Sequence, residues 1–219
     1  MDVPPLVDSV AGDDPDLPRV LVVGDSISMN YHDAAKAALE GVANYYRNEG
    51  NGSSTDHGVK NLEVWLGDYR EKGRHWDVIQ FNHGLHDLKQ PYDATTGTWG
   101  DYAVPLGKYR ENLEREVAIL KKTEATLIWC STTPVPNDNT GQYSRRKGAA
   151  VEYNRAAMEV MREHPEIQIN DLHAFVCKTN AFDQWRMGND VHFWSQDLQG
   201  LLGEAVAASI AKALSDRRK

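Results

Sequence analysis

The sequence has little of three things that would place it in a specialised class: cysteine, basic charge and long apolar runs. Its 219 residues include only two cysteines, Cys130 and Cys177, which cannot define a disulfide framework and leave a single bridge open. Lys and Arg number 24 against 32 Asp and Glu, so the net charge is −8. This balance argues against nucleic acid or an anionic membrane as a partner. No apolar run approaches the roughly 20 residues of a membrane span.

Metal-binding signatures are absent as well. There is no C-x-x-C and no H-E-x-x-H pattern, and we expect no cofactor and no metal. The first 18 residues are acidic, rich in Pro and Asp, and lack the apolar core of a signal peptide. We expect them to form a surface lead-in before one domain over residues 19–219. A leader could have been removed, so a secreted, periplasmic or other soluble location stays open, as does the oligomeric state.

What is present is an alternation of short apolar runs and longer amphipathic segments. The runs predict strands over residues 20–23, 42–46, 76–81, 125–130 and 167–169. The longer segments predict helices over residues 29–39, 59–66, 108–122, 148–162 and 198–214, with residues 172–187 irregular or partly helical. Residues 90–107 form a polar and aromatic insertion, which is typical of a functional or mobile loop. The alternation predicts an α/β fold with a parallel sheet between two layers of helices.

Ser26 occupies a position of special interest, on a turn between the first strand and the first helix. Gly24 ends the apolar strand, so Ser26 is expected at the carboxyl end of a strand, where open α/β sheets place their sites. A helix N-terminus there would favour developing negative charge. Ser26 is therefore either a nucleophile or simply the cap of the helix, while Asp25 is expected to hold the turn by bonding nearby amides.

Three further loops are expected at the same edge of the sheet. They contain Gly50 and Gly52, residues 84–87, and His192. A serine nucleophile needs a base and donors for an oxyanion. His192 can be the base, and the amides of Ser26 and Gly52, with a side chain from residues 84–87, can be the donors. The elbow of the α/β-hydrolases fits poorly, because Ser28 replaces its last glycine.

Four segments in this order resemble the blocks of the SGNH (GDSL-type) hydrolase family. They are G-D-S-I-S at 24–28, the glycine loop at 50–55, G-L-H-D at 84–87 and N-D-V-H-F at 189–193. The resemblance implies a flavodoxin-like, three-layer α/β/α fold with a central, mainly parallel sheet. It also implies Ser26 as nucleophile, His192 as base, and Gly52 in the oxyanion hole, with Gly50 as the fallback.

Two residues depart from the family pattern. His86 stands at the position of the oxyanion asparagine, and an imidazole can donate there only in the right tautomer. Asn189 stands at the position of the triad aspartate. Either a Ser–His dyad operates, with Asn189 or a backbone carbonyl orienting the imidazole, or Asp190 reaches the imidazole by a different loop path. The dyad is the preferred interpretation.

Several other side chains have two interpretations. Trp99, Trp185 and Trp194 are expected in loops, where they would either stack on sugars or pack against the sheet. His83, His86 and Asp87 would be the ligands if the site held a metal, although Asp87 is more simply a structural residue of its turn.

These observations predict a serine ester hydrolase that works through an acyl-serine intermediate. The expected substrate is a small-molecule or oligosaccharide ester, and the expected reaction is the removal of short acyl groups, acetyl above all, from carbohydrate. The alternatives are a lipase, thioesterase or O-acyltransferase of the same fold, or a degenerate sugar-binding protein.

Overall fold

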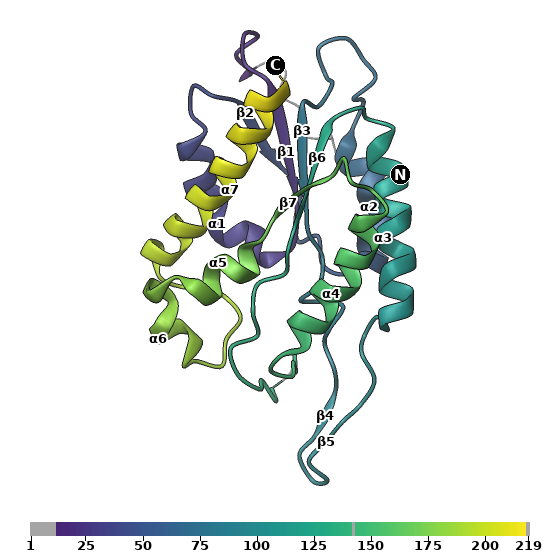
Figure 1. Ribbon diagram of the computed structural model, residues 1–219, viewed down its shortest axis with the longest axis vertical. Coiled ribbons are helices and arrows are strands. Elements are labelled where there is room, and N and C mark those ends of the chain that lie inside the picture. Colours follow the sequence, from purple (N-terminus) through teal and green to yellow (C-terminus); the bar gives the residue numbers. More distant parts are fainter. Residues whose placement is uncertain (1–11, 142, 218–219) are drawn as a thin grey trace.

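Five parallel strands form the centre of the molecule in the order β2-β1-β3-β6-β7 (Figure 1). The computed structural model describes residues 12–141 and 143–217. The strands of the sheet are β1 (Arg19–Val23), β2 (Asn44–Arg47), β3 (Val78–Phe81), β6 (Thr126–Cys130) and β7 (Gln168–Asn170). The expected three-layer fold with a parallel central sheet is confirmed, and its strand order is the flavodoxin-like one.

Helices cover both faces of this sheet (Figure 1). One face carries α1 (Ser26–Ala38) and α7 (Gln196–Arg217), and the other carries α2 (Thr55–Leu66), α3 (Leu106–Lys121) and α4 (Ala149–Arg162). Between β7 and α7 the chain forms α5 (Leu172–Lys178), a 3-10 turn at Asn180–Phe182 and α6 (Asp183–Arg186). Gly203 brings α7 close to α1, because a Cβ there would lie 2.5 Å from the Cβ of Ala34.

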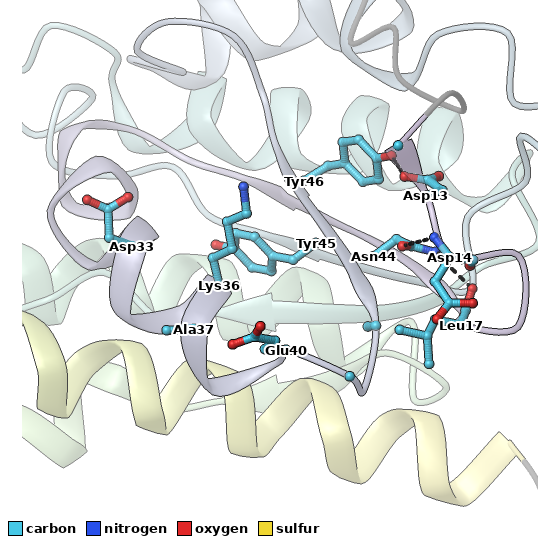
Figure 2. A pocket seen from close by; sticks show the side chains of 13 residues that line it. Asp13, Asp14, Leu17, Asp33, Lys36, Ala37, Glu40, Asn44, Tyr45 and Tyr46 are labelled. Atoms are coloured by element: carbon cyan, nitrogen blue, oxygen red, sulfur yellow. Dashed lines mark hydrogen bonds between the residues drawn. The ribbon is translucent and has the colours of Figure 1, made fainter.

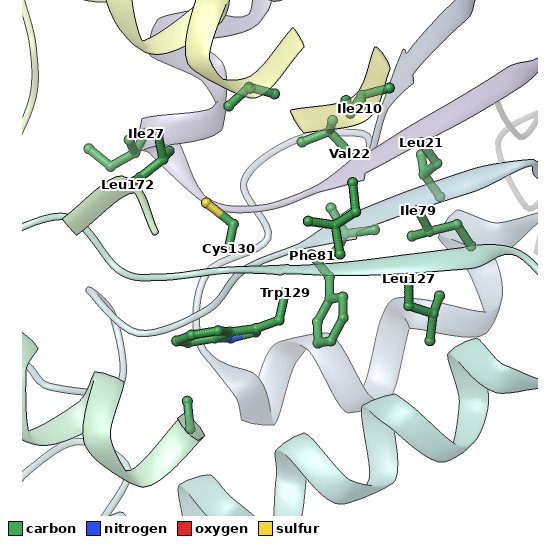
Figure 3. Close-up of a cluster of buried hydrophobic side chains, with 14 of the residues drawn as sticks. Leu21, Val22, Ile27, Ile79, Phe81, Leu127, Trp129, Cys130, Leu172 and Ile210 are labelled. Atoms are coloured by element: carbon green, nitrogen blue, oxygen red, sulfur yellow. The ribbon is translucent and has the colours of Figure 1, made fainter. Parts of the chain in front are cut away.

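The core explains why the apolar runs are strands. Leu21 and Val22 of β1 are fully buried, and they lie in the cluster that includes Phe81 of β3 and Trp129 of β6 (Figure 3). Strands covered on both faces need side chains that are apolar on both faces, which is what the unbroken runs supply. Each such side chain contributes about 1.5–3 kcal/mol on burial.

The strand order fixes where a site can form. After β1 the chain crosses to β2 on one side of the sheet, and after β3 it crosses to β6 on the other side. The loops that leave β1 and β3 therefore run in opposite directions at the carboxyl edge. Val23 is the register partner of Phe81, and the turn at Ser26 therefore lies beside the loop that begins at Asn82. Crevices at such switch points are the usual binding sites of open α/β sheets.

The boundaries of several elements differ from expectation. α1 begins at Ser26 rather than at residue 29, and α2 begins at Thr55 rather than at residue 59. The insertion at residues 90–107 contains a small hairpin, β4 (Tyr92–Asp93) and β5 (Thr98–Trp99), which extends beyond the helices in Figure 1. Both helices begin earlier than expected because side chains of neighbouring loops accept hydrogen bonds from their first amides. Hydrophobic periodicity gives no signal for such bonds.

The expected lead-in is described only from residue 12. There Asp13 pairs with Arg19 at 2.9 Å, and Asn44 bonds Asp14 at the outer edge of β2; residues 1–11 lie outside the described residues. Both cysteines are free thiols, Cys130 buried and Cys177 exposed. In the described part of the chain, no helix has the length and apolar character that crossing a membrane would require.

Candidate active site

Ser26 is the first residue of α1 and does not cap it. Asp25 is the N-cap residue, and its buried carboxylate accepts a hydrogen bond of 2.9 Å from the amide of Ile27. The expectation that Asp25 holds the turn is confirmed, and the capping alternative for Ser26 is wrong. As a first-turn residue, Ser26 has no helical carbonyl for its own amide to bind. Its hydroxyl and its amide are thus both available at the helix N-terminus.

His192 lies against Ser26. Its Nε2 atom is 2.9 Å from Ser26 Oγ, and its Nδ1 atom is 2.8 Å from Oδ1 of Asp190. A carboxylate only accepts, so Nδ1 carries the proton and Nε2 offers its lone pair to the serine hydroxyl. This is the arrangement of nucleophile, base and orienting acid that serine hydrolases use.

The carboxylate that contacts the imidazole comes from Asp190 and not from the position of Asn189. Oδ1 of Asp190 also accepts from the amide of His192 at 3.0 Å, and Oδ2 accepts from Trp194 Nε1 at 2.7 Å. Burial acts to raise the pKa of Asp190, but these hydrogen bonds outweigh it and the pKa is lowered. Asn189 is exposed and lines the adjoining pocket. The contacts favour the alternative in which Asp190 reaches the imidazole over the preferred dyad, because the loop turns back after Asp190 and brings Oδ1 against both the backbone amide and the Nδ1 atom of His192.

Gly52 is placed at the site but its amide is occupied. It donates to the carbonyl of Gly24 at 3.0 Å. Gly52 allows this close approach, since a Cβ there would lie 2.5 Å from that same carbonyl oxygen. The fallback, Gly50, is exposed and its carbonyl accepts from Arg47. The expectation that Gly52 donates to an oxyanion is therefore wrong for the loop as it stands.

Ser53, which sequence reasoning missed, is the residue of this loop that faces the next one. It adopts φ 57°, and its hydroxyl lies 3.1 Å from His86 Nδ1. Its amide is held by Asn51 Oδ1 at 2.9 Å. A non-glycine residue in the left-handed region is uncommon and concentrates at functional sites, but no sequence pattern signals it.

His86 has its tautomer fixed by Lys89. The ammonium nitrogen of Lys89 lies 3.0 Å from Nδ1 of His86, and an ammonium only donates. Nδ1 therefore keeps its lone pair and Nε2 carries the single N–H. Burial, followed by the charges of Lys89 and Arg145, lowers the pKa of His86 to about 3. The imidazole is a neutral donor, as an oxyanion position needs, and Lys89 provides the second contact that fixes its tautomer.

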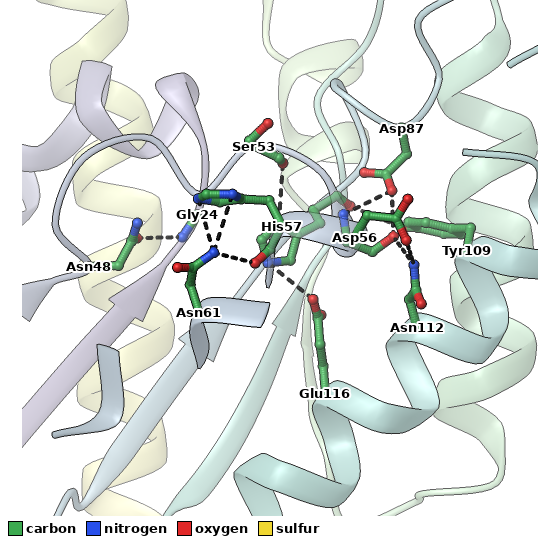
Figure 4. A network of polar contacts seen from close by, with 12 residues as sticks. Gly24, Asn48, Ser53, Asp56, His57, Asn61, Asp87, Tyr109, Asn112 and Glu116 are labelled. Carbon is green, nitrogen blue, oxygen red and sulfur yellow. Dashed lines mark hydrogen bonds and ion pairs between the residues drawn. The ribbon is translucent and has the colours of Figure 1, made fainter. Parts of the chain in front are cut away.

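Asp87 instead anchors the start of α2, within the polar network that also contains Asp56 and Asn112 (Figure 4). Its Oδ1 accepts from the amide of Thr55 at 2.9 Å and from the Thr55 hydroxyl at 2.5 Å. Asn112 on α3 donates to the same hydroxyl and to Asp56. Burial raises the pKa of Asp87 to about 7. The interpretation of Asp87 as a structural residue fits these contacts.

His83 joins the loop after β2 to α3. Its Nδ1 lies 3.2 Å from the carbonyl of Ser53, its Nε2 lies 3.4 Å from Glu116, and the hydroxyl of Tyr109 donates to its carbonyl at 2.9 Å. Burial lowers the pKa of His83 to about 4 and raises that of Glu116 well above its usual range, so burial favours the neutral form of each. His83, His86 and Asp87 thus face different protein partners, and within the described residues no cluster of three or more His, Cys, Asp or Glu side chains is suited to hold a metal.

A pocket of about 460 Å³ opens beside His192 and is lined by Asn139, Tyr143, Arg145, Asn189, Asp190, His192 and Trp194. Of the three tryptophans considered from the sequence, only Trp194 lines it. Trp185 donates to the carbonyl of His192 at 2.9 Å and stacks on Phe193, so it holds the histidine loop from behind. Trp99 packs against Tyr92 in the hairpin, with ring centroids 4.9 Å apart.

A second pocket, of about 580 Å³, lies along the edge strand β2 (Figure 2). Tyr45 and Tyr46 line it together with Lys36 of α1 and residues 12–14 and 17. Ser26, His86 and His192 do not line this pocket, whereas His192 lines the pocket of about 460 Å³ described above.

Comparison with known proteins identifies the fold. No family model matches the chain, and no curated protein sequence does. Among solved structures, the acetyl xylan esterase AlAXEase is similar at 15% identity and a TM-score of 0.65, over 88% of this chain and 99% of that one. A lipase/acylhydrolase from Enterococcus faecalis has 20% identity and a TM-score of 0.63, over 89% and 96%. A GDSL-like lipase from Bacteroides thetaiotaomicron VPI-5482 has 14% identity and a TM-score of 0.62, over 89% and 88%. The chain has the SGNH hydrolase fold.

Proposed function

We propose that this protein is a serine ester hydrolase that removes short acyl groups, chiefly acetyl, from carbohydrate. The observation that carries the proposal is the line of contacts from Ser26 through His192 to Asp190, with distances of 2.9 Å and 2.8 Å. A serine hydroxyl bonded to an oriented, partly exposed imidazole is an activated nucleophile. The fold, which is shared with esterases and acylhydrolases, supports the same chemistry.

The reaction follows from these contacts. Ser26 Oγ attacks the ester carbonyl while His192 Nε2 takes its proton, and Asp190 balances the charge of the imidazolium. The oxyanion accepts from the amide of Ser26 and from Nε2–H of His86, with the positive end of α1 beneath it. His192 then returns the proton to the leaving alcohol. A water, deprotonated by the same nitrogen, releases the acid from the acyl-serine.

The carbohydrate substrate is supported by the pocket next to His192. Tyr143 and Trp194 are 57% and 71% exposed there, and exposed amphipathic rings suit the apolar faces of sugars. The other residues that line the pocket are polar, so it offers no apolar surface that would bind a long acyl chain. The similarity of the fold to an acetyl xylan esterase is in keeping with this choice.

Two measurements test the proposal. A fluorophosphonate probe should label the wild-type protein and not the Ser26→Ala variant. Turnover of nitrophenyl esters should be highest for acetyl and fall towards octanoyl, and acetate should be released from acetylated xylo-oligosaccharides. Sugar binding without labelling would replace the proposal by a sugar-binding function, and a preference rising steadily with acyl length would replace it by a lipase or thioesterase function.

A further inference from the structure

Arg145 is a buried cation that no described carboxylate contacts, although the charges of Asp25 and Asp190 act on it from a greater distance. It is 5% exposed, and it is held in place by a bridge between its backbone and that of Asn139. Its Nε donates to the carbonyl of Leu85 at 2.8 Å and its Nη1 to the carbonyl of Tyr143 at 3.1 Å. Among the described residues, no carboxylate lies within 4 Å of the guanidinium, and Nη2 has no hydrogen-bond partner, although Arg145 lines the pocket beside His192.

This arrangement is costly for the protein on its own. A buried charge is normally paired, since taking it out of water is expensive and two carbonyl dipoles compensate only in part. Lys89 is a second cation here, and its ammonium group contacts His86 and the ring of Tyr143 but no described carboxylate. Asp25 and Asp190 act on Arg145 through their charges, but neither forms a hydrogen bond with it. An anionic group on the substrate would supply the hydrogen-bonding partner that Nη2 of Arg145 lacks.

The position of Arg145 indicates which half of the ester carries that group. His192 returns its proton to the leaving alcohol, so the pocket on the imidazole side receives the alcohol half. Arg145 shares this pocket with Tyr143 and Trp194, the two exposed rings suited to a sugar face. A pyranose between those rings would present its substituents to a guanidinium edge, and a planar carboxylate matches that edge in geometry and charge.

We propose that the alcohol half of the substrate is an acidic sugar, an O-acetylated uronate, whose carboxylate is bound by Arg145. This rests on the proposed function for the identity of the alcohol pocket. Hydrogen bonds to charged groups at a partly buried site contribute enough for a preference of about 10- to 100-fold over a neutral sugar. Sequence reasoning could not find this residue, because Arg145 lies in an irregular segment and is brought to the site only by its loop.

The first experiment compares hydrolysis of a mono-O-acetylated methyl glucuronoside with that of its carboxylate methyl ester. The measured quantity is the ratio of the two kcat/KM values, so changes common to both substrates cancel. We expect a ratio of about 10–100 for the wild-type enzyme, a ratio near one for Arg145→Gln, and an intermediate ratio for Arg145→Lys. Arg146→Gln is the matched control: it removes the same charge one residue away, where Arg146 pairs with Glu152, and should keep the wild-type ratio.

The second experiment measures binding of unacetylated methyl glucuronoside and methyl glucoside to the Ser26→Ala protein by calorimetry. Tighter binding of the glucuronoside by tenfold or more supports the carboxylate site, even if neither ester is hydrolysed and the proposed function fails. Equal binding of the two sugars would overturn the inference, and so would a wild-type kcat/KM ratio near one with both esters hydrolysed. The second result would still support the proposed ester hydrolase function. If Arg145→Gln does not fold, the wild-type ratio and this binding comparison still decide. A ratio that falls equally in Arg146→Gln would also overturn the inference.

Discussion

Replacing Asp190 by Ala should lower kcat/KM about 100-fold. Two unit charges 4 Å apart attract by about 1 kcal/mol in water and about 4 kcal/mol near a protein surface. The side chain of Asp190 is 50% exposed, so its charge stabilises the imidazolium by about 2 kcal/mol after allowance for solvent screening. Freeing the ring of His192 from its orientation adds about 1 kcal/mol of side-chain entropy. The sum of about 3 kcal/mol corresponds to about two orders of magnitude in rate.

The Asp190→Asn variant separates charge from geometry. With its oxygen towards His192, the new amide keeps both bonds to that residue but sets its NH₂ group against the indole N–H of Trp194. Flipped, it accepts from Trp194 but donates to Nδ1, which moves the imidazole proton to Nε2 and removes the base. The wrong tautomer costs about 10⁴ in rate in a serine protease. Adding Trp194→Phe removes the competing donor, so the double variant should be more active than Asp190→Asn alone.

The assay is kcat/KM for nitrophenyl acetate at neutral pH, with folding checked by circular dichroism. Asn189→Ala is the control and should remain within about threefold of wild type, because Asn189 is exposed and the imidazole contacts its neighbour instead. An Asp190→Ala enzyme within threefold of wild type, or an equal loss in Asn189→Ala, would refute the assignment of Asp190 as the orienting acid.

The other predictions concern the serine, the two imidazoles and pH. Ser26→Ala and His192→Ala should each lose several orders of magnitude in kcat, and the double variant should be no worse than the worse single one; additive losses would show that they do not act as a unit. His86→Ala should lower kcat about 10²–10³-fold with little change in KM, and His86→Asn should retain more; a loss of thermal stability with kcat nearly unchanged would remove His86 from the site. The pKa of His86 is about 3 in the folded protein against about 6.5 unfolded. The unfolded chain therefore binds an extra proton between these values, and stability falls as pH falls through them. His86→Asn should reduce that dependence by up to about 1.4 kcal/mol per pH unit in urea unfolding between pH 4.5 and 6, and equal slopes would contradict it.

The fold could be predicted because its determinants are local. Strands buried on both faces need unbroken apolar runs such as Val20–Val23, and the covering helices need an apolar stripe. The proximity of Ser26 and His192 could be predicted for a related reason: each follows or precedes a recognisable element, and topology brings those positions to one edge. The helix starts were predicted less well, since Asp25 and Asp87 determine them through side-chain bonds.

The rest of the site depends on loop conformation, which pattern does not encode. Asp190 reaches His192 because the loop folds back within two residues. The family pattern places the acid three residues before the histidine and so gives no sign of this turn. Gly52 gives up its amide to Gly24 because the loop settles onto the end of β1. Ser53 then takes the left-handed backbone position beside His86. The hydrophobic periodicity of the sequence does not distinguish these loop conformations from other possible ones.

Lys89 gives a physical reason why histidine can stand where the family has asparagine. An asparagine amide always presents its donors, whereas a neutral imidazole presents one, at whichever nitrogen the other contact leaves protonated. Lys89 fixes that choice by donating to Nδ1, and its charge, together with burial, holds the pKa of His86 far below neutrality. Burial favours the neutral forms of the neighbouring His83 and Glu116, whereas the charges of Asp25 and Asp87 act on Lys89. At the proposed oxyanion position, the charge of Lys89 and the N-terminus of α1 both have the sign that stabilises a developing negative charge.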